Sequence, residues 1–265
     1  MVRAQEILQK ARNKELVVGA HVFFAHYEIT EAFGFMGYDF VWIDGEHSAF
    51  DREKILANII AANSGGTASF VRVAWNDPVL IKPILEMGPD GIILPMISTA
   101  EEARRAVAAC TYPPEGIRGF GPRRANRYGT MATDEYLQNV NQSFLKIMQI
   151  ESYQGVENLE EIMAVPGVDL IMVGPNDLSG SLGLLGQTRH PEVMKYFDLL
   201  AEKCLKANMP FGTSLCTSDE ESIRDWINRG VDLIGCADDL SLVRTGGQRM
   251  LTFVHELRKN RETQV

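Results

Sequence analysis

The sequence is poor in the features that mark several common protein classes. Its 265 residues include only four cysteines, Cys110, Cys204, Cys216 and Cys236, and no two of them form a CxxC pair. Zinc-ribbon and thioredoxin chemistry therefore have no support. We expect each cysteine to be a small, buried, apolar residue in a reducing compartment.

Long apolar runs and excess positive charge are also missing. No run is long enough to span a bilayer, and the charged, amphipathic start MVRAQEILQKARNKEL has no apolar signal-peptide core. The net charge is −9 and the pI is about 5.1, a balance that repels nucleic acid and anionic lipid. We therefore expect a cytoplasmic protein with no nucleic-acid partner and no membrane partner.

What the sequence does contain is a regular alternation of short apolar runs with longer segments of helical spacing. Eight runs read as buried parallel strands: 17–21, 40–43, 69–73, 91–94, 145–150, 170–173, 211–213 and 233–237. Helical spacing covers 4–13, 52–63, 78–87, 99–109, 156–163, 192–207, 219–228 and 241–258.

This alternation predicts an α/β fold, a single (β/α)8 TIM barrel over residues 1–265 with a short N-terminal helix. The structural alternative is an open, doubly wound sheet. That alternative is disfavoured because no GxGxxG opens the first strand-to-helix turn. In a barrel, the active site lies at the carboxyl ends of the strands.

Polar side chains gather at these strand ends. They are Asp44, Glu46, His47, Arg72, Gln149, Glu151, Asn176 and Asp177. Glu151 and Asp177 follow adjacent strands, and two carboxylates in one mouth repel each other unless a cation lies between them. Hard oxygen ligands suit Mg²⁺, Mn²⁺ and similar ions. For Asp177 alone, capping of the next helix is an equal alternative.

His47 lies in the polar segment FVWIDGEHSAFD, with Asp44 and Glu46 within three residues. Acids so placed orient an imidazole as a general base near neutral pH. Asp51 is more simply the N-cap of the following helix.

Arg72 ends the apolar strand SFVRV, where a guanidinium needs an anionic partner. The partner is a carboxylate of the barrel end, an anionic oxygen of the substrate, or both.

Two groups of basic residues need a separate interpretation. The loop TYPPEGIRGFGPRRANRYG holds Arg118, Arg123, Arg124 and Arg127, which suit either anion capture or solvated surface positions. Lys146 is the only lysine within a predicted strand, but it begins that strand and should face away from the mouth. This placement argues against a lysine Schiff base.

At these residues the sequence resembles the HpcH/HpaI family of class II pyruvate aldolases. The matching stretches run through nearly the whole chain in order: FVWIDGEHSAFD, VRVAWNDPVLIKPILEMGPDGIILPMI, TYPPEGIRG, QIESYQGVENLEEIMAVPGVDLIMVGPNDLSGSLG and VDLIGCADDLSLV. The resemblance implies a barrel of the phosphoenolpyruvate/pyruvate type. It also implies cleavage of 4-hydroxy-2-oxo acids into pyruvate and an aldehyde, with a divalent metal ion (Mg²⁺, Mn²⁺ or Co²⁺) and a homo-oligomer, usually a hexamer, with pockets at subunit contacts.

Residue by residue, the resemblance implies that His47 is the catalytic base and that Asp44 accompanies it. Arg72 holds the pyruvate oxygen, while Glu151 and Asp177 bind the metal. Substrate contacts fall on Gln149 and on the backbone around Gly174, Asn176 and Asp177.

The sequence departs from the family at two positions. Glu86 stands where relatives carry an Asp paired with the base, and His21 stands where some carry a bulky aromatic side chain near the acceptor pocket. A CoA-thioester lyase of the citryl or malyl type, a decarboxylase on the same barrel and a non-catalytic binding barrel remain the alternatives.

Overall fold

The computed structural model describes residues 3–215 and 219–262 of the chain. Its centre is a closed barrel of parallel strands, in which every strand pairs with the next in sequence and β8 pairs with β1. The strands are β1 (Val17–Val22), β2 (Phe40–Asp44), β3 (Ala68–Arg72), β4 (Gly91–Leu94), β5 (Leu145–Ile150), β6 (Leu170–Val173), β7 (Phe211–Ser214) and β8 (Leu233–Asp238). The predicted TIM barrel is confirmed, and each predicted strand end lies within one residue of the observed one.

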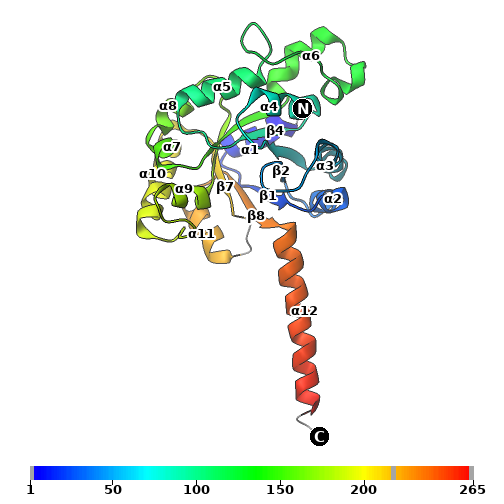
Figure 1. Ribbon diagram of the computed structural model, residues 1–265, viewed down its shortest axis with the longest axis vertical. Coiled ribbons are helices and arrows are strands. Elements are labelled where there is room, and N and C mark those ends of the chain that lie inside the picture. The colour runs from blue at the N-terminus through cyan, green and yellow to red at the C-terminus, as the bar shows by residue number, and fades with distance from the viewer. Residues whose placement is uncertain (1–2, 216–218, 263–265) are drawn as a thin grey trace.

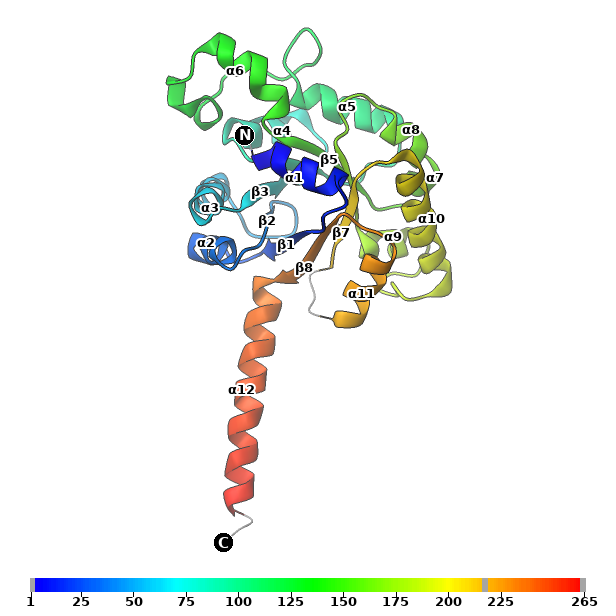
Figure 2. The ribbon, with the colours of Figure 1, turned by 180° about the vertical axis from the view of Figure 1, so that it is seen from behind.

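Helices surround the barrel (Figures 1 and 2). The helices are α1 (Arg3–Arg12), α2 (Tyr27–Phe35), α3 (Arg52–Gly65), α4 (Pro78–Glu86), α5 (Ala100–Cys110), η1 (Arg124–Gly129), α6 (Thr133–Asn139), η2 (Val140–Gln142), α7 (Tyr153–Glu157), α8 (Leu159–Met163), α9 (Pro175–Ser181), α10 (Pro191–Ala207), α11 (Glu220–Asn228) and α12 (Asp239–Glu262).

Two apolar layers hold this arrangement together. Phe40, Trp42 and Phe70 belong to the layer inside the barrel, and the apolar face of α1 joins that layer. Helix α1 contacts β1, β3 and β5 and therefore covers the barrel at the amino ends of the strands. The larger layer lies between the strands and the outer helices. The opposite end, where the strands finish, is left for a site.

Side-chain caps explain several of the helix starts. Asp51 accepts the N–H of Lys54 and caps α3 as predicted. Thr99 and Glu102 form a capping box at the start of α5.

The sequence pattern does not predict helix α2, and its N-cap residue His26 makes no side-chain cap. This helix is fixed by packing instead. A Cβ on Gly34 would lie 2.6 Å from the carbonyl oxygen of Gly65 in α3, so only glycine permits this approach.

The cysteines behave largely as expected. Cys110 and Cys204 are buried free thiols, Cys236 is half-buried, and Cys216 lies outside the described residues. Across residues 3–215 and 219–262, no helix combines the length and apolar character that a membrane crossing requires.

Helix α12 differs from the other helices. It extends away from the barrel as a single rod of 24 residues, about 36 Å long at 1.5 Å per residue (Figure 1). Apolar side chains along it stay exposed, among them Leu251, Phe253 and Leu257. The C-terminal helix predicted at 241–258 is confirmed, but its apolar side chains are not covered by the described residues of the same chain.

Candidate active site

A cavity of about 270 Å³ opens at the carboxyl ends of the strands, and it is here called the mouth. Most of the predicted site residues line it, although they come from four different strands and the loops after them. The lining residues are His21, Phe23, Trp42, Asp44, His47, Arg72, Gln149, Glu151, Val173, Gly174, Pro175, Asn176, Asp177 and Ser214.

Asp44 and Arg72 form a buried ion pair at the ends of β2 and β3, where they are register partners. Arg72 Nε lies 3.1 Å from Asp44 Oδ1, and Nη2 lies 2.5 Å from Oδ2. Burial alone would raise the pKa of Asp44, but the hydrogen bonds and the charge of Arg72 outweigh it, and the pKa is lowered. Arg72 therefore has the anionic partner that its position in an apolar strand predicts.

Asp44 also positions the loop that carries His47. Its Oδ1 accepts the backbone N–H groups of Glu46 at 2.9 Å and of His47 at 3.2 Å. The Glu46 carboxylate lies 3.0 Å from Arg72 Nη1 and 3.7 Å from His47 Nε2. His47 lines the mouth and is largely exposed, so its imidazole is accessible to both solvent and substrate.

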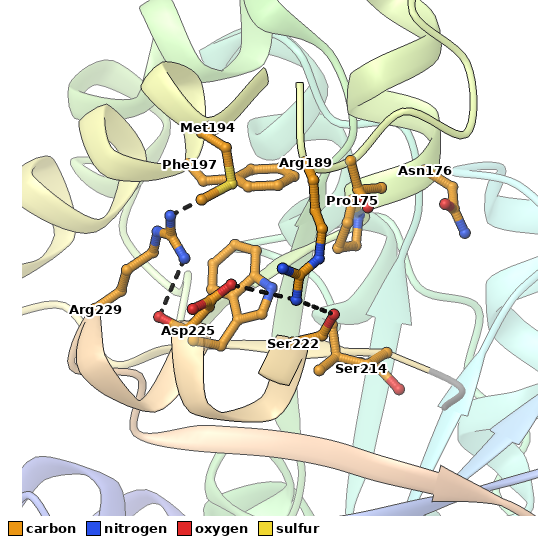
Figure 3. A pocket seen from close by; sticks show the side chains of 12 residues that line it. Pro175, Asn176, Arg189, Met194, Phe197, Ser214, Ser222, Asp225 and Arg229 are labelled. Carbon is orange, nitrogen blue, oxygen red and sulfur yellow. Dashed lines mark hydrogen bonds and ion pairs between the residues drawn. The ribbon is translucent and has the colours of Figure 1, made fainter. Parts of the chain in front are cut away.

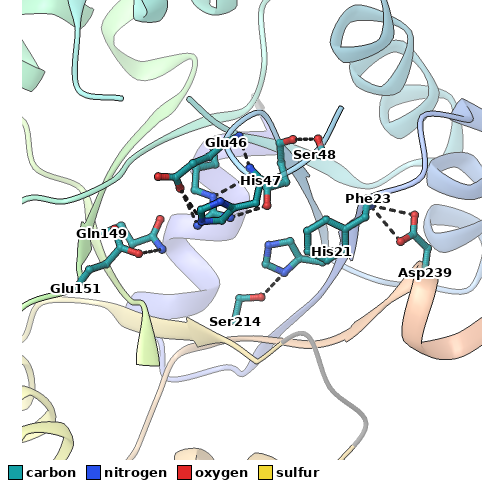
Figure 4. Close-up of polar contacts among 11 residues, drawn as sticks. His21, Phe23, Glu46, His47, Ser48, Gln149, Glu151, Ser214 and Asp239 are labelled. Atoms are coloured by element: carbon teal, nitrogen blue, oxygen red, sulfur yellow. Dashed lines mark hydrogen bonds and ion pairs between the residues drawn. The ribbon is translucent and has the colours of Figure 1, made fainter. Parts of the chain in front are cut away.

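Glu151 is buried on the opposite side of the mouth. One carboxylate oxygen accepts the Gln149 amide N–H at 2.8 Å (Figure 4). The other accepts the backbone N–H of Met96 at 2.8 Å. Burial raises the pKa of Glu151 to about 7, and the negative charges of Glu46 and Asp177 add to this effect. No positively charged side chain forms an ion pair with Glu151 within the described residues.

Gly174 and Asp177 complete that side. A Cβ on Gly174 would lie 2.5 Å from Glu151 Oε1, so the carboxylate occupies space that only glycine leaves open. Gly174, not Asp177, is the N-cap of α9. Asp177 lies inside the first turn, so the capping alternative for this residue is wrong and its carboxylate stays in the mouth.

Glu86, the arginine-rich loop and Lys146 all lie outside the mouth. Glu86 ends α4 and forms an ion pair of 3.1 Å with buried Arg118, towards the amino ends of the strands. Arg124 donates to the carbonyl oxygens of Met87 and Gly88. The arginine loop therefore does not cover the mouth of its own chain, since a connection from a helix to the next strand lies at the other end of a barrel.

Lys146 is also outside the mouth, as expected. Its Nζ lies 3.7 Å from Asp169 Oδ2 and 3.4 Å from the carbonyl oxygen of Asn141, both of which precede strands.

Met96, Trp42 and Ser214 contribute to the mouth but are not among the residues predicted from the sequence. Met96, two residues after β4, adopts a positive φ of 57° and points its N–H at Glu151. Trp42 and Ser214 both line the mouth from within strands. Position at the end of a strand is the only signal in the sequence for Met96 and Ser214, whereas Trp42 looks like an ordinary core residue.

A metal ion would have few side-chain ligands here. Over the described residues, no group of three or more His, Cys, Asp and Glu side chains is arranged to hold a metal. Glu151 and Asp177 supply two carboxylates, which is compatible with Mg²⁺, an ion that usually keeps several water ligands or binds substrate oxygens.

Comparison with known proteins agrees with this geometry. Residues 18–245 match the family model described as HpcH/HpaI aldolase/citrate lyase. The chain belongs to this family. It is 37% identical over 222 residues, or 83% of this chain and 85% of the relative, to a 5-keto-4-deoxy-D-glucarate aldolase from Shigella boydii serotype 18.

Solved structures agree as well. An HpcH/HpaI aldolase/citrate lyase family protein from Burkholderia cenocepacia J2315 matches with a TM-score of 0.89 at 31% identity, over 94% of this chain and 99% of that one. The citrate synthase SbnG matches with a TM-score of 0.79 at 28% identity, over 96% and 97%. The protein is thus an aldolase of the HpcH/HpaI family, a carbon–carbon lyase, and metal dependence is typical of that family.

Proposed function

We propose that this aldolase cleaves 4-hydroxy-2-oxo acids to pyruvate and an aldehyde, and forms them in reverse, with a divalent cation held by Glu151 and Asp177. One observation carries the proposal. A buried carboxylate and a second carboxylate share a cavity with an arginine, and the buried one has no cationic partner among the described residues. Such a pair is costly unless a cation joins it.

The donor set fits a hard divalent ion. Gln149 and Met96 hold the Glu151 carboxylate in place, and Gly174 leaves room for it. The raised pKa of Glu151 reflects burial beside like charges, and a bound cation would favour the ionised form. When bound, the cation supplies Lewis-acid polarisation of the 2-oxo group. Mg²⁺, Mn²⁺ and Co²⁺ are all candidates.

The residues of the chain would carry the remaining steps. N–H groups around Gly174, Asn176 and Asp177 receive the substrate carboxylate, as the start of a helix favours an anion. His47 removes the proton from the C4 hydroxyl, the C3–C4 bond breaks, and the aldehyde leaves. The electron pair remains on C3 as the pyruvate enolate, and a proton returned to C3 gives pyruvate.

Arg72 would stabilise the enolate oxygen. A guanidinium has five N–H groups. Asp44 and Glu46 contact its three nitrogens once each, so N–H groups remain for the substrate.

The first experiment is a lactate dehydrogenase-coupled assay for pyruvate, using a panel of 4-hydroxy-2-oxo acids. The enzyme is treated with EDTA and then assayed with and without Mg²⁺, Mn²⁺ or Co²⁺. We expect pyruvate only with added metal. Pyruvate that forms regardless of metal would contradict the metal-dependent mechanism, and Lys146→Ala, expected to keep most activity, would then be the decisive variant.

A second function deserves comparison because the family model also covers citrate lyases. A CoA-thioester lyase would release pyruvate from none of these substrates and would require CoA. A decarboxylase using the same enolate would release CO₂ from a 2-oxo acid that carries a second carboxylate on C3, leaving pyruvate and no aldehyde. Measuring the aldehyde together with pyruvate separates these three reactions.

We further propose that the protein is a homo-oligomer, with the family's hexamer as the expected state, and that it works in the cytoplasm. The exposed apolar face of α12 supports the assembly, because a single chain leaves it in water. Within one chain Glu86 is remote from His47, so pairing of these two residues would require a second subunit. Light scattering of the full chain should give a mass of six subunits, and a monomer at micromolar concentration would contradict it.

A further inference from the structure

The carboxylate of Glu151 is fixed from two directions. Its Oε1 accepts the side-chain N–H of Gln149, which lies two residues earlier in the chain (Figure 4). Its Oε2 accepts the backbone N–H of Met96 at 2.8 Å. Met96 belongs to the loop after β4, residues 95–98, here called the β4 loop. The orientation of the Glu151 carboxylate therefore depends on a segment more than fifty residues away in sequence.

The Met96 N–H points at Glu151 because Met96 adopts a left-handed backbone, with φ of 57°. Residues with a Cβ rarely adopt this conformation, since the Cβ crowds the following carbonyl oxygen. Packing of the Met96 side chain does not account for the conformation, because 39% of the residue is exposed. Backbone strain of this kind persists where the surrounding structure enforces it, and it gathers at sites that hold a functional group in place.

Further hydrogen bonds hold the β4 loop against the segment that carries Glu151. Ile97 is buried, and its N–H donates to the carbonyl oxygen of Gln149 at 3.1 Å. The hydroxyl oxygens of Ser98 and Ser152 lie 2.6 Å apart. The β4 loop thus contacts the chain just before Glu151 and just after it, as well as at its carboxylate.

The β4 loop is also anchored to the helices around it. The carbonyl oxygen of Ser98 accepts the side-chain N–H of Asn158, between α7 and α8, at 2.9 Å. The N–H of Ser98 donates to Glu102 Oε2 in the first turn of α5 at 2.8 Å. A Cβ on Gly155 in α7 would lie 2.9 Å from the carbonyl oxygen of Ile97, so α7 packs directly on the loop. These contacts restrain the β4 loop on both sides.

The part of the mouth around Asn176 is supported differently. Asn176 also lines an adjoining cavity of about 120 Å³. Side chains join the walls of that cavity: Arg189 lies 3.4 Å from Ser222 Oγ and 3.6 Å from Asp225 Oδ2 (Figure 3). Since these contacts involve no residue of the β4 loop, they provide a control for changes close to the mouth.

Resting on the proposed aldolase function, we propose that Met96 is a positioning residue and that the left-handed backbone of the β4 loop sets the affinity of the site for a divalent cation. Each carboxylate oxygen can accept more than one bond, so the N–H groups of Gln149 and Met96 leave acceptor capacity on Glu151 for a cation. A ligand that its surroundings already orient binds a metal ion more tightly than one that binding has to order.

Two substitutions at Met96 separate the backbone from the side chain. Met96→Val and Met96→Gly both remove the thioether, but a β-branched residue is strongly disfavoured at positive φ, whereas glycine adopts it readily. We expect Met96→Val to weaken Mn²⁺ binding by about 10–100-fold, the effect of disturbing groups around a ligand. Met96→Gly should stay within about 2-fold of the wild type. The measurement is electron paramagnetic resonance of free Mn²⁺, titrated into the full chain after EDTA treatment and removal of the EDTA.

Ser98 tests the anchor of the β4 loop away from the carboxylate. Ser98→Ala removes the hydroxyl contact with Ser152, so we expect Mn²⁺ affinity to fall by about 3–10-fold, the value of one hydrogen bond. Ser98→Thr keeps the hydroxyl and should retain wild-type affinity.

Two controls apply a similar perturbation elsewhere. Asn208, the C-cap of α10, has a φ of 50° and lies outside the mouth, so Asn208→Val strains the backbone in the same way. It should lower the free energy of unfolding in urea and leave Mn²⁺ affinity unchanged. Arg189→Ala breaks the contacts of the adjoining cavity and should also leave Mn²⁺ affinity unchanged.

The outcomes separate the two proposals. A folded Met96→Val with wild-type Mn²⁺ affinity, or an equal loss of affinity in Met96→Gly or in either control, overturns the role of the β4 loop while the cation site and the aldolase function stand. Absence of Mn²⁺ binding by the wild type, or binding that Glu151→Gln leaves intact, overturns the cation site of the proposed function and this proposal with it. If circular dichroism shows that Met96→Val is unfolded, the Ser98 pair decides instead, and wild-type affinity in Ser98→Ala would then overturn the proposal.

Discussion

The two sides of the mouth balance their charges differently. On one side Arg72 is paired with Asp44 and Glu46, and all three are held by direct contacts. On the other side Glu151 and Asp177 face the cavity with amide donors but no ion pair in the described part of the chain. The paired side is complete as folded and can position groups, whereas the acidic side fits the cation proposed above, which folding alone does not supply.

The largest effect should come from breaking the acidic side. Glu151→Gln keeps the shape of the side chain but removes the ligand charge, so we expect a loss of kcat/KM of roughly three orders of magnitude, since a Lewis acid supplies several kcal/mol. Metal affinity, measured by isothermal titration calorimetry, should fall in parallel. Glu161→Gln on the exposed surface of α8 is the control. Retained metal binding in Glu151→Gln would assign the cation to other residues.

Breaking the ion pair of the paired side should mainly lower the stability of the folded protein. Asp44→Ala leaves the buried Arg72 without its main partner, so the free energy of unfolding should fall by about 3–5 kcal/mol in urea denaturation. The double variant Asp44→Leu with Arg72→Met should regain stability without regaining activity. If the free energy of unfolding of Asp44→Ala equals that of the wild type, the Asp44–Arg72 ion pair does not stabilise the fold.

The substitution Gly174→Ala tests the geometry of the acidic side without changing any charge. A Cβ there would meet the Glu151 carboxylate, so Gly174→Ala should shift it and lower metal affinity and kcat/KM by about 10–100-fold, the range seen when groups around a ligand are disturbed. Gly121→Ala, where a Cβ meets open space, should change neither quantity. Equal effects of the two substitutions would argue that the Glu151 carboxylate is not held against Gly174.

The smallest expected effect is a change in how stability depends on pH, and it comes from His21 in the mouth. Unfolded His21 takes up a proton near pH 6.5, but the folded residue stays neutral until about pH 3. The stability due to the neutral form is therefore complete above pH 6.5 and declines by about 1.4 kcal/mol per pH unit as the pH falls towards 3. His21→Gln removes this contribution, so urea denaturation between pH 6.5 and 5 should show a shallower decline. Identical slopes would place His21 in a hydrated environment.

Much of the fold was accessible from the sequence because parallel strands covered on both faces are uninterrupted apolar runs. Their positions and the groups that follow them, such as Asp44 and Glu151, could be read directly. Helix α2 could not, since Gly34 meeting Gly65 is a contact between distant segments. Trp42 could not be distinguished from other core aromatics, because the lack of an acceptor for its N–H among the described residues depends on what surrounds it.

The sequence by itself determined the barrel, the end of the barrel that carries the site and the residue types that collect there. Local apolar spacing and strand order are enough for that, since the end of each parallel strand must reach the same edge. Only the tertiary structure decided that Asp177 lies within α9 instead of capping it, that Glu86 pairs with Arg118 away from His47, and that Trp42 faces the mouth. These depend on which side chains from distant segments meet and on how much water is left around them, and no local pattern encodes either.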